Sequence, residues 1–418
     1  MTFLQINCKN KTISIRDAML SGIEVFILLF TIWNKSVGNK LLNKDVQNYI
    51  NANLKTDLHS LLLKKSPFPE VSIQEIVQQI KGKQVAEKKF PFLLKDGIIF
   101  PPQLSLEQSS SEKTAFYKSE ILKGKKFIDL TSGFGIDAYY LSQNFDDITL
   151  IEQNTELLEI VEHNWNTLGK QARFINQKLE DFLNENQESF DTIYLDPARR
   201  DQNKNKVFLL EDLSPNILEI HEKLLSISDQ VIIKLSPLID LKYLVSALSN
   251  IFRIDCIALK NDVKEVVIFL SKENKKDIIC NCVNLESGES AFSFTFGEEE
   301  NAKSEYSEPE KFIYIPNNSI LKAGIFNLIS EKFGLKKLHP NTHLYTSSEK
   351  KEEFPGRIFE MEAIDSKNIK KKGHFNIISK NYPLKPEEIK KKYGLKDGGN
   401  DYLIFTQSKK GKIILKSV

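Results

Sequence analysis

One short segment near residue 130 constrains the fold of this chain more than any other part of the sequence. An apolar stretch that begins at Phe127 ends in an acid, Asp129, and two glycines follow at Gly133 and Gly135. Glycine tolerates tight, left-handed turns and lets a backbone approach a ligand closely. The segment therefore predicts a buried strand, a glycine loop and then a helix, with a ligand bound at the loop.

After this segment, short apolar stretches alternate with helical patterns, as they do in successive βαβ units. Asn154 is expected to cap one of these helices, and Gly169 is expected to end it. The alternation predicts an α/β domain with a parallel sheet covered on both faces. The expected strands are Phe127–Leu130, Ile148–Ile151, Ala172–Ile175, Thr192–Leu195 and Val231–Leu235, followed by an antiparallel pair at Ile251–Leu259 and Glu265–Leu270.

The charge around the glycine loop favours a cationic ligand. Gly133, Gly135 and Ala138 also fit the Gly-x-Gly-x-x-Gly/Ala pattern of dinucleotide sites, where bare amides bind a diphosphate. Asp129 would repel a diphosphate, but it would favour the sulfonium and ammonium groups of S-adenosylmethionine. Glu152 ends the next expected strand and is placed to accept both hydroxyls of a ribose, which either ligand offers. The alternative is an ordinary βα turn with glycines for close packing.

The adenine of such a ligand is expected just after the third strand, which ends near Asn176. Lys178 stands where an acidic residue would suit the adenine, so Leu179 or Glu180 is the expected contact. A plain helix start is the other interpretation of this segment. The predicted cofactor-binding residues are Asp129, Thr131, Gly133, Gly135, Glu152, Gln153, Leu179 and Glu180.

An acid and a proline, Asp196 and Pro197, follow the fourth expected strand. Ligands of open parallel sheets bind beyond the carboxyl ends of the strands, so Asp196 is expected beside the reacting methyl group. Methyl transfer to an amino group needs the nitrogen lone pair aligned with the S–CH₃ bond. The Asp196 carboxylate and the Pro197 carbonyl can accept the two N–H bonds and provide that alignment. We predict that both are catalytic; a strand-ending Asp-Pro turn is the alternative.

Basic residues gather towards the C-terminus, although the whole chain has a net charge of only +2. From Glu331 onward there are 20 Lys and Arg residues against 11 Asp and Glu residues. This imbalance suggests an anionic partner such as RNA, and a solvated lysine-rich surface is the alternative. Lys391 and Lys392, close to a Gly-Gly turn, are expected to contact phosphates, or else to form a solvated helix end.

The sequence predicts neither a metal site nor a disulfide framework. It has four cysteines, and Cys280 and Cys282 lack metal-site spacing, so reduced, buried thiols and a cytoplasmic location are expected. The longest apolar run, Ile23–Trp33, is about half as long as a bilayer span requires. A buried helix or a start-site extension is preferred there over a secretory signal, because no small-residue cleavage site follows. No membrane association is expected, and the sequence does not specify an oligomeric state.

These motifs resemble those of class I S-adenosylmethionine-dependent methyltransferases. Asp129, the two loop glycines and Glu152 match the donor-binding pattern, and Asp196-Pro197 is similar to the Asp/Asn-Pro-Pro-aromatic motif of amino-methylating members. The chain departs from that motif at Ala198 and Arg199. An arginine in place of the aromatic residue can stack by its guanidinium plane or hold a phosphate, so Arg199 and Arg200 are predicted to bind substrate.

A closer resemblance covers the chain from about residue 41. It is to a Bacteroidetes-type group of methyltransferases that carry a ferredoxin-like and a THUMP-like domain, and it implies an RNA substrate. The motifs that carry it are Glu107–Glu112 with Tyr117-Lys118, Asp196–Asp201, Lys234–Pro237, Lys322–Gly324, Gly334–Asn341 and Leu395–Gly399.

The predicted fold is a Rossmann-like class I methyltransferase domain with a helical N-terminal domain and small α+β C-terminal domains. The expected boundaries are 1–40 for an extension, 41–105 for the helical domain, 106–272 for the methyltransferase domain, 273–345 for the ferredoxin-like domain and 346–418 for the THUMP-like domain.

Overall fold

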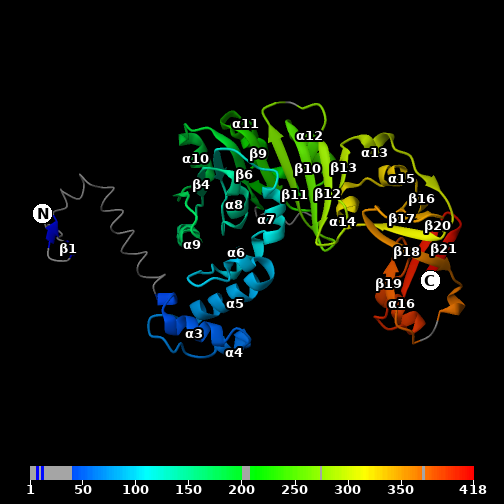
Figure 1. Cartoon of the computed structure of the whole chain (residues 1–418), viewed down its shortest axis with the longest axis horizontal. Coiled ribbons are helices and arrows are strands. Elements are labelled where there is room, and N and C mark those ends of the chain that lie inside the picture. The colour runs from blue at the N-terminus through cyan, green and yellow to red at the C-terminus, as the bar shows by residue number, and fades with distance from the viewer. Residues whose placement is uncertain (1–5, 9–10, 14–39, 200–207, 274, 370–371) are drawn as a thin grey trace. The chain divides into compact units, whose positions relative to one another are not determined.

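The computed structural model describes residues 6–8, 11–13, 40–199, 208–273, 275–369 and 372–418 (Figure 1). They form two compact units, Met1–Asn186 and Gln187–Val418. In the first unit, β1 (Ile6–Cys8) and β2 (Lys11–Ile13) form an antiparallel hairpin. The apolar run Ile23–Trp33, for which a helix was expected, lies outside the described residues.

The helices expected between about residues 41 and 90 are present, and side-chain caps mark where several of them begin. A capping box starts the longest of these helices: the Ser72 hydroxyl accepts from the Glu75 amide at 3.2 Å, and the Glu75 carboxylate accepts from the Ser72 amide at 2.7 Å. Such reciprocal bonds satisfy amides that a helix start leaves unpaired. The elements are α3 (Lys44–Ala52), α4 (Leu58–Leu62), α5 (Ile73–Lys89), η1 (Pro91–Leu93), α6 (Gln103–Gln108) and α7 (Glu112–Ser119).

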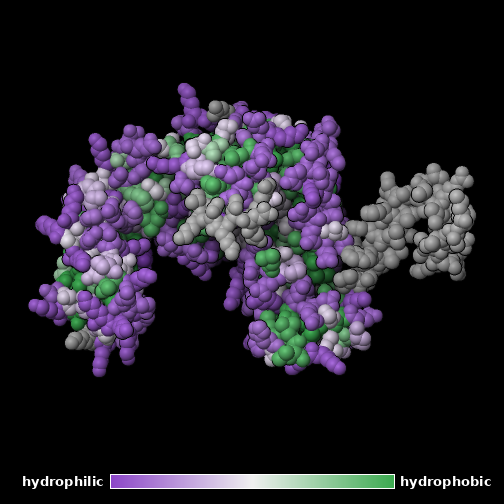
Figure 2. Space-filling model, turned by 180° about the vertical axis from the view of Figure 1, so that it is seen from behind, coloured by the Kyte–Doolittle hydropathy of each residue, from purple (hydrophilic) through white to green (hydrophobic). Residues whose placement is uncertain are grey.

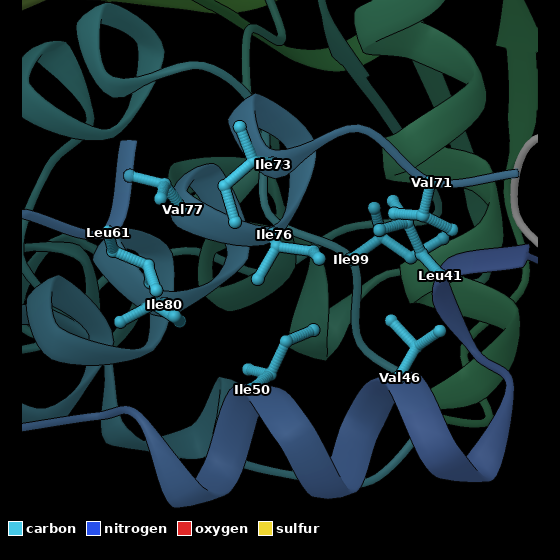
Figure 3. Close-up of a cluster of buried hydrophobic side chains, with 10 residues drawn as sticks. All are labelled: Leu41, Val46, Ile50, Leu61, Val71, Ile73, Ile76, Val77, Ile80 and Ile99. Atoms are coloured by element: carbon cyan, nitrogen blue, oxygen red, sulfur yellow. The ribbon is translucent and has the colours of Figure 1, made fainter. Parts of the chain in front are cut away.

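A core of aliphatic side chains joins α3 to α5. Figure 3 shows Val46 and Ile50 on one face of α3, pointing into a cluster that also contains Ile76 and Ile80. Ile50, Ile76 and Ile80 are fully buried, so truncating one of them should cost about 2–5 kcal/mol of unfolding free energy. Figure 2 shows that apolar residues also reach the surface of this domain. Leu63, just after α4, is 89% exposed.

The predicted βαβ alternation is confirmed in the first unit. Three parallel strands lie side by side, with β4 between β3 and β5. Asn154 caps α9 by accepting from the Leu157 amide at 3.1 Å, and Gly169 follows that helix with φ +76°, as expected. The elements are β3 (Lys126–Asp129), α8 (Ile136–Leu141), η2 (Ser142–Asn144), β4 (Asp147–Ile151), α9 (Thr155–Thr167), β5 (Arg173–Ile175) and α10 (Leu179–Glu185).

The second unit begins with a mixed sheet in the strand order β6-β9-β11-β10-β12-β13. β6 and β9 are parallel, and the predicted antiparallel pairing of β10 with β11 is confirmed. The elements are β6 (Phe190–Leu195), β7 (Ala198–Arg199), η3 (Leu210–Asp212), β8 (Leu213–Ser214), α11 (Ile217–Ile227), β9 (Ser228–Leu235), α12 (Leu241–Ala247), β10 (Ile251–Leu259), β11 (Asp262–Ser271), β12 (Ile279–Leu285) and β13 (Phe292–Thr295). Because β12 pairs with β10, the sheet continues past the domain boundary expected after residue 272.

An eight-stranded sheet completes the second unit, in the order β14-β16-β17-β15-β18-β21-β20-β19. Its central strand β18 pairs with β15 on one side and with β21 on the other. The elements are α13 (Glu298–Asn301), β14 (Glu305–Tyr306), β15 (Phe312–Pro316), α14 (Asn318–Ala323), α15 (Leu328–Phe333), β16 (Lys336–His339), β17 (Thr342–Ser347), β18 (Gly356–Ala363), η4 (Ser366–Asn368), β19 (Asn376–Ser379), α16 (Pro386–Tyr393), β20 (Tyr402–Ser408) and β21 (Gly411–Ser417).

Three expectations for this region differ from the structure. The polar stretch 298–310, interpreted as a loop, contains the short helix α13 and the short strand β14. The single helix expected at Ile320–Phe333 is two helices, because Gly324 ends α14 in the left-handed region at φ +73°. The boundary expected after residue 345 falls inside β17.

Candidate active site

The glycine loop, residues 130–135, joins β3 to α8, and a buried carboxylate at the end of β3 accepts a hydrogen bond from one of its amides. Asp129 is 1% exposed, and its Oδ1 accepts a hydrogen bond from the Thr131 amide at 2.9 Å. The Ser132 amide donates to the Ile151 carbonyl at 2.9 Å, which ties the loop to the end of β4. Gly133 has φ +53°, a conformation that L side chains rarely adopt.

Gly135 packs against α9 more closely than any side chain would permit. It lies in the left-handed region at φ +72°. A Cβ atom built on it would lie 2.9 Å from Val161 Cγ1 and 3.0 Å from Trp165 Nε1. The two glycines predicted from the sequence are therefore needed for different reasons. Gly133 allows a left-handed turn, whereas Gly135 allows both a left-handed turn and the close approach of α9.

Glu152, directly after β4, is hydrogen-bonded to the glycine loop. Its Oε2 accepts from the Gly133 amide at 3.0 Å and its Oε1 accepts from the Asn154 amide at 2.8 Å. The carboxylate is half-buried, and the next residue, Gln153, is exposed. Asn176 Nδ2 donates to the carbonyls of Glu152 and Gln153, at 2.9 and 3.1 Å. The sequence did not assign a role to Asn176; its position at the end of β5 was the available signal.

The segment predicted to meet the adenine is the start of a helix, α10. Leu179 is its first residue and is buried, whereas Glu180 and the preceding Lys178 are exposed. Asp129, Gly133 and Glu152 are thus brought together by direct hydrogen bonds around one loop. Leu179 and Glu180 follow the neighbouring strand β5, without a hydrogen bond to the loop in the described part of the chain.

Lys170 anchors the far end of α8. Its ammonium donates to the Tyr139 carbonyl at 2.5 Å and to Ser142 Oγ at 2.9 Å, and it lies 5.2 Å from the centre of the Trp165 ring. Burial lowers the pKa of Lys170 to about 8, because the protein interior solvates the ammonium less well than water does. A cation is favourable at this position because it satisfies carbonyl oxygens near the end of a helix.

The acceptor loop, residues 196–199, follows β6 in the second unit. Asp196 Oδ2 lies 2.5 Å from Lys234 Nζ, and the two side chains are 35% and 11% exposed. β6 and β9 are parallel neighbours in which Leu195 faces Ile233, so the next residue on each strand is Asp196 and Lys234. Pro197 is buried. In the sequence, Lys234 belongs to a motif but has no assigned role; a single lysine within the apolar stretch Val231–Leu235 is the signal that could have identified it.

Arg199, the first of the two predicted substrate-binding arginines, ends the acceptor loop. The guanidinium of Arg199 lies 5.9 Å from the centre of the Phe208 ring, a distance typical of a cation–π contact. Arg199 is exposed and belongs to β7, which pairs with β8. Arg200, the second predicted substrate-binding arginine, lies outside the described residues.

The remaining predicted substrate contacts, Lys391 and Lys392, are exposed at the end of α16. Their neighbour Lys390 forms two ion pairs: its Nζ lies 2.7 Å from Glu387 Oε1 and 2.6 Å from Asp397 Oδ2. These lysines lie on the helix α16, not on the elements that carry Asp129 or Asp196. Among the described residues, the predicted site residues therefore fall into four groups: the glycine loop with the end of β4, the start of α10, the acceptor loop and the end of α16.

Cys256, Cys280 and Cys282 are free and buried. Burial raises the pKa of the Cys280 and Cys282 thiols, so both stay protonated at neutral pH. Within the described residues, no three His, Cys, Asp or Glu side chains are arranged to hold a metal ion. Over the same residues, no helix has the length and apolar composition that a membrane span requires.

Three family models match successive parts of the chain. Residues 112–225 match Conserved hypothetical protein 95, residues 312–355 match a ferredoxin-like domain, and residues 356–416 match a THUMP domain-like family. A curated relative, an uncharacterised RNA methyltransferase of Mycoplasma mobile, is 27% identical over 199 residues. That alignment covers 43% of this chain and 54% of the relative, so the chain spans about half the length of that protein.

One solved structure matches nearly the whole chain. It is a protein from Porphyromonas gingivalis W83 named as a candidate methyltransferase, with 28% sequence identity and a TM-score of 0.78. The match covers 88% of this chain and 96% of that one. Together the matches confirm the resemblance that the motifs predicted: the chain has the class I methyltransferase fold, followed by ferredoxin-like and THUMP-like domains.

Proposed function

We propose that the protein is an S-adenosylmethionine-dependent methyltransferase that acts on RNA, with a nitrogen as the methylated atom. The observation that carries the proposal is the pair of carboxylates around the glycine loop, Asp129 beneath it and Glu152 beside it. A cytoplasmic location is part of the proposal and is supported by the free, buried thiols.

The loop suits S-adenosylmethionine better than a dinucleotide. A diphosphate would need bare loop amides, yet the Gly133 amide donates to Glu152 at 3.0 Å and the Thr131 amide donates to Asp129 at 2.9 Å. Two anions at the loop would repel phosphates and attract a ligand that carries positive charge. Glu152 would accept from the ribose hydroxyls, and the first turn of α10, at Leu179 and Glu180, is proposed to meet the adenine. When bound, this cofactor supplies an electrophilic methyl group.

The acceptor loop is proposed to hold the target nitrogen. Asp196 and the Pro197 carbonyl would accept its N–H bonds and so direct its lone pair. Lys234 lies against Oδ2 of Asp196, and this contact fixes the orientation of the carboxylate.

An RNA substrate is supported by the nature of the relative and by the basic C-terminal region. The Mycoplasma mobile relative is named as an RNA methyltransferase, and the C-terminal match is THUMP domain-like. The exposed Lys391 and Lys392, together with Arg199 and Arg200, would contact the phosphate backbone. Such contacts position a nucleic acid without reading its sequence.

Transfer of tritium from methyl-labelled S-adenosylmethionine to total RNA tests the proposal. The RNA should come from cells that lack the enzyme, so that its target nucleotide is unmodified. We expect label in RNA, and mass spectrometry of the digested RNA would then identify the nucleotide and the methylated atom. Label that enters only protein or small molecules would reject RNA as the acceptor. RNA binding without binding of S-adenosylmethionine would indicate a catalytically silent RNA-binding protein.

Reversing the charge of Lys391 and Lys392 should weaken RNA binding without changing affinity for the cofactor. Each lost phosphate contact removes about one unit from the slope of log affinity against log salt, so we expect a slope smaller in magnitude by about two. Filter binding over a series of KCl concentrations measures it. The matched control is the same double reversal at Lys64 and Lys65, which are exposed after α4. Equal slopes for the two variants would contradict a contact at α16.

A further inference from the structure

A buried charge network lies in the first unit and has no part in the function proposed so far. It consists of Ser110, Lys118 and Asp137. Lys118 Nζ lies 2.8 Å from Asp137 Oδ1, and the two side chains are 1% and 9% exposed. Ser110 Oγ donates to the other carboxylate oxygen at 2.6 Å and lies 3.4 Å from the Lys118 ammonium.

Stability alone does not explain such a network. Taking two charges out of water costs several kcal/mol for each ion, and their mutual attraction often only repays that cost. Replacing a buried ion pair with apolar side chains of similar volume is often neutral or stabilising. What the network supplies is geometry: one partner on each oxygen fixes both the position and the rotation of the Asp137 carboxylate.

The network connects the glycine loop to the helix that precedes the sheet in sequence. Asp137 is the second residue of α8 and lies two residues after Gly135. Ser110 lies immediately before Ser111, the N-cap of α7, and Lys118 lies in the last turn of that helix. The carboxylate therefore bonds to residues at both ends of α7 and links that helix to the first turn of α8, directly after the glycine loop.

We propose that Ser110, Lys118 and Asp137 are positioning residues for the cofactor: they hold the glycine loop in the shape that binds S-adenosylmethionine. The inference rests on the proposed function, because it assumes that this ligand binds at the loop. It also gives a physical role to two motifs in this sequence, Glu107–Glu112 and Tyr117-Lys118, that otherwise remain unexplained. Preorganising a loop saves the cost of ordering it on binding, and a displacement of about 1 Å can cost about a hundredfold in function.

Calorimetric titration of the whole protein with S-adenosylhomocysteine, the demethylated product, tests the inference without any turnover. We expect Lys118→Met, Asp137→Asn and Ser110→Ala each to weaken binding by about tenfold or more. The matched control is Ile50→Ala, which removes a fully buried side chain from the core of the helical domain and should also lower the melting temperature. The control should keep the wild-type dissociation constant, because Ile50 belongs to the cluster of α3 and α5.

A double variant separates positioning from folding. Lys118→Met with Asp137→Leu removes both charges together, so neither is left buried without its partner. We expect its melting temperature to recover towards the wild-type value while its affinity for S-adenosylhomocysteine stays at least about tenfold weaker. Recovery of both quantities would overturn the inference and make the network purely structural. Failure of the wild-type protein to bind would overturn the proposed function as well, whereas unchanged binding by the variants would overturn this inference alone.

Discussion

Replacing Asp196 with alanine should lower the turnover number by about two orders of magnitude or more, while the affinity for S-adenosylmethionine stays nearly unchanged. The Asp196 carboxylate is proposed to hold the acceptor nitrogen in the transition state, when the lone pair of that nitrogen is directed at the methyl group. Loss of such a contact lowers kcat and kcat/KM together and leaves cofactor binding alone. Single-turnover methylation of RNA gives the rate, and calorimetry gives the dissociation constant of the cofactor.

The Lys234 contact supplies the control for this experiment. Lys234→Met keeps the Asp196 carboxylate but removes the cation 2.5 Å from its Oδ2, so we expect a smaller loss of turnover than in Asp196→Ala. The double variant should resemble Asp196→Ala alone, since lysine is proposed to act through that carboxylate. A loss of cofactor affinity as large as the loss of turnover would instead place Asp196 in the cofactor site.

Replacing Gly135 with alanine should abolish measurable cofactor binding. The new methyl group would lie 2.9 Å from Val161 Cγ1 and would stand on a backbone at φ +72°. A side chain in the left-handed region costs about 1–2 kcal/mol, and overpacking a close contact costs about 1–3 kcal/mol more. The loop and α9 must therefore separate, which displaces the amide that Glu152 holds.

Gly169 provides the matched glycine. It has nearly the same backbone conformation, φ +76°, but no atom lies within 4 Å of a Cβ built there. Gly169→Ala should thus cost only the backbone term, about 1–2 kcal/mol of unfolding free energy, and should leave cofactor affinity unchanged. Denaturant unfolding and calorimetry of both variants measure these quantities. Equal effects of the two substitutions would show that close packing at Gly135 has no importance.

Local features of this fold could be predicted from the sequence, because the chemistry that causes them lies within a few residues. The strand before Asp129, the positive φ of Gly133 and the side-chain cap at Asn154 are of this kind. So is Glu152, since an acid at the end of a strand next to a glycine loop lies within reach of the loop amides.

Features that depend on the order of strands could not be predicted in the same way. The Asp196–Lys234 contact exists because β6 lies beside β9, and nothing within either segment specifies its neighbour. The expected boundary after residue 272 failed to mark the end of a sheet for the same reason: β12 pairs with β10, not with the strands that follow it in sequence. The buried charge network joins Ser110 to Asp137 across 27 residues, and only packing brings them together.

The double pairing of β18 has a consequence for how the C-terminal half evolves and unfolds. The THUMP-like match begins at Gly356, the first residue of β18, and that strand is also hydrogen-bonded to β15 of the ferredoxin-like match. Dividing the gene between residues 355 and 356 would leave β15 as an unpaired edge strand, which is prone to aggregation. The ferredoxin-like and THUMP-like domains should therefore be inherited together, unfold as one unit and be transferable to another protein only together, even though two separate family models match them.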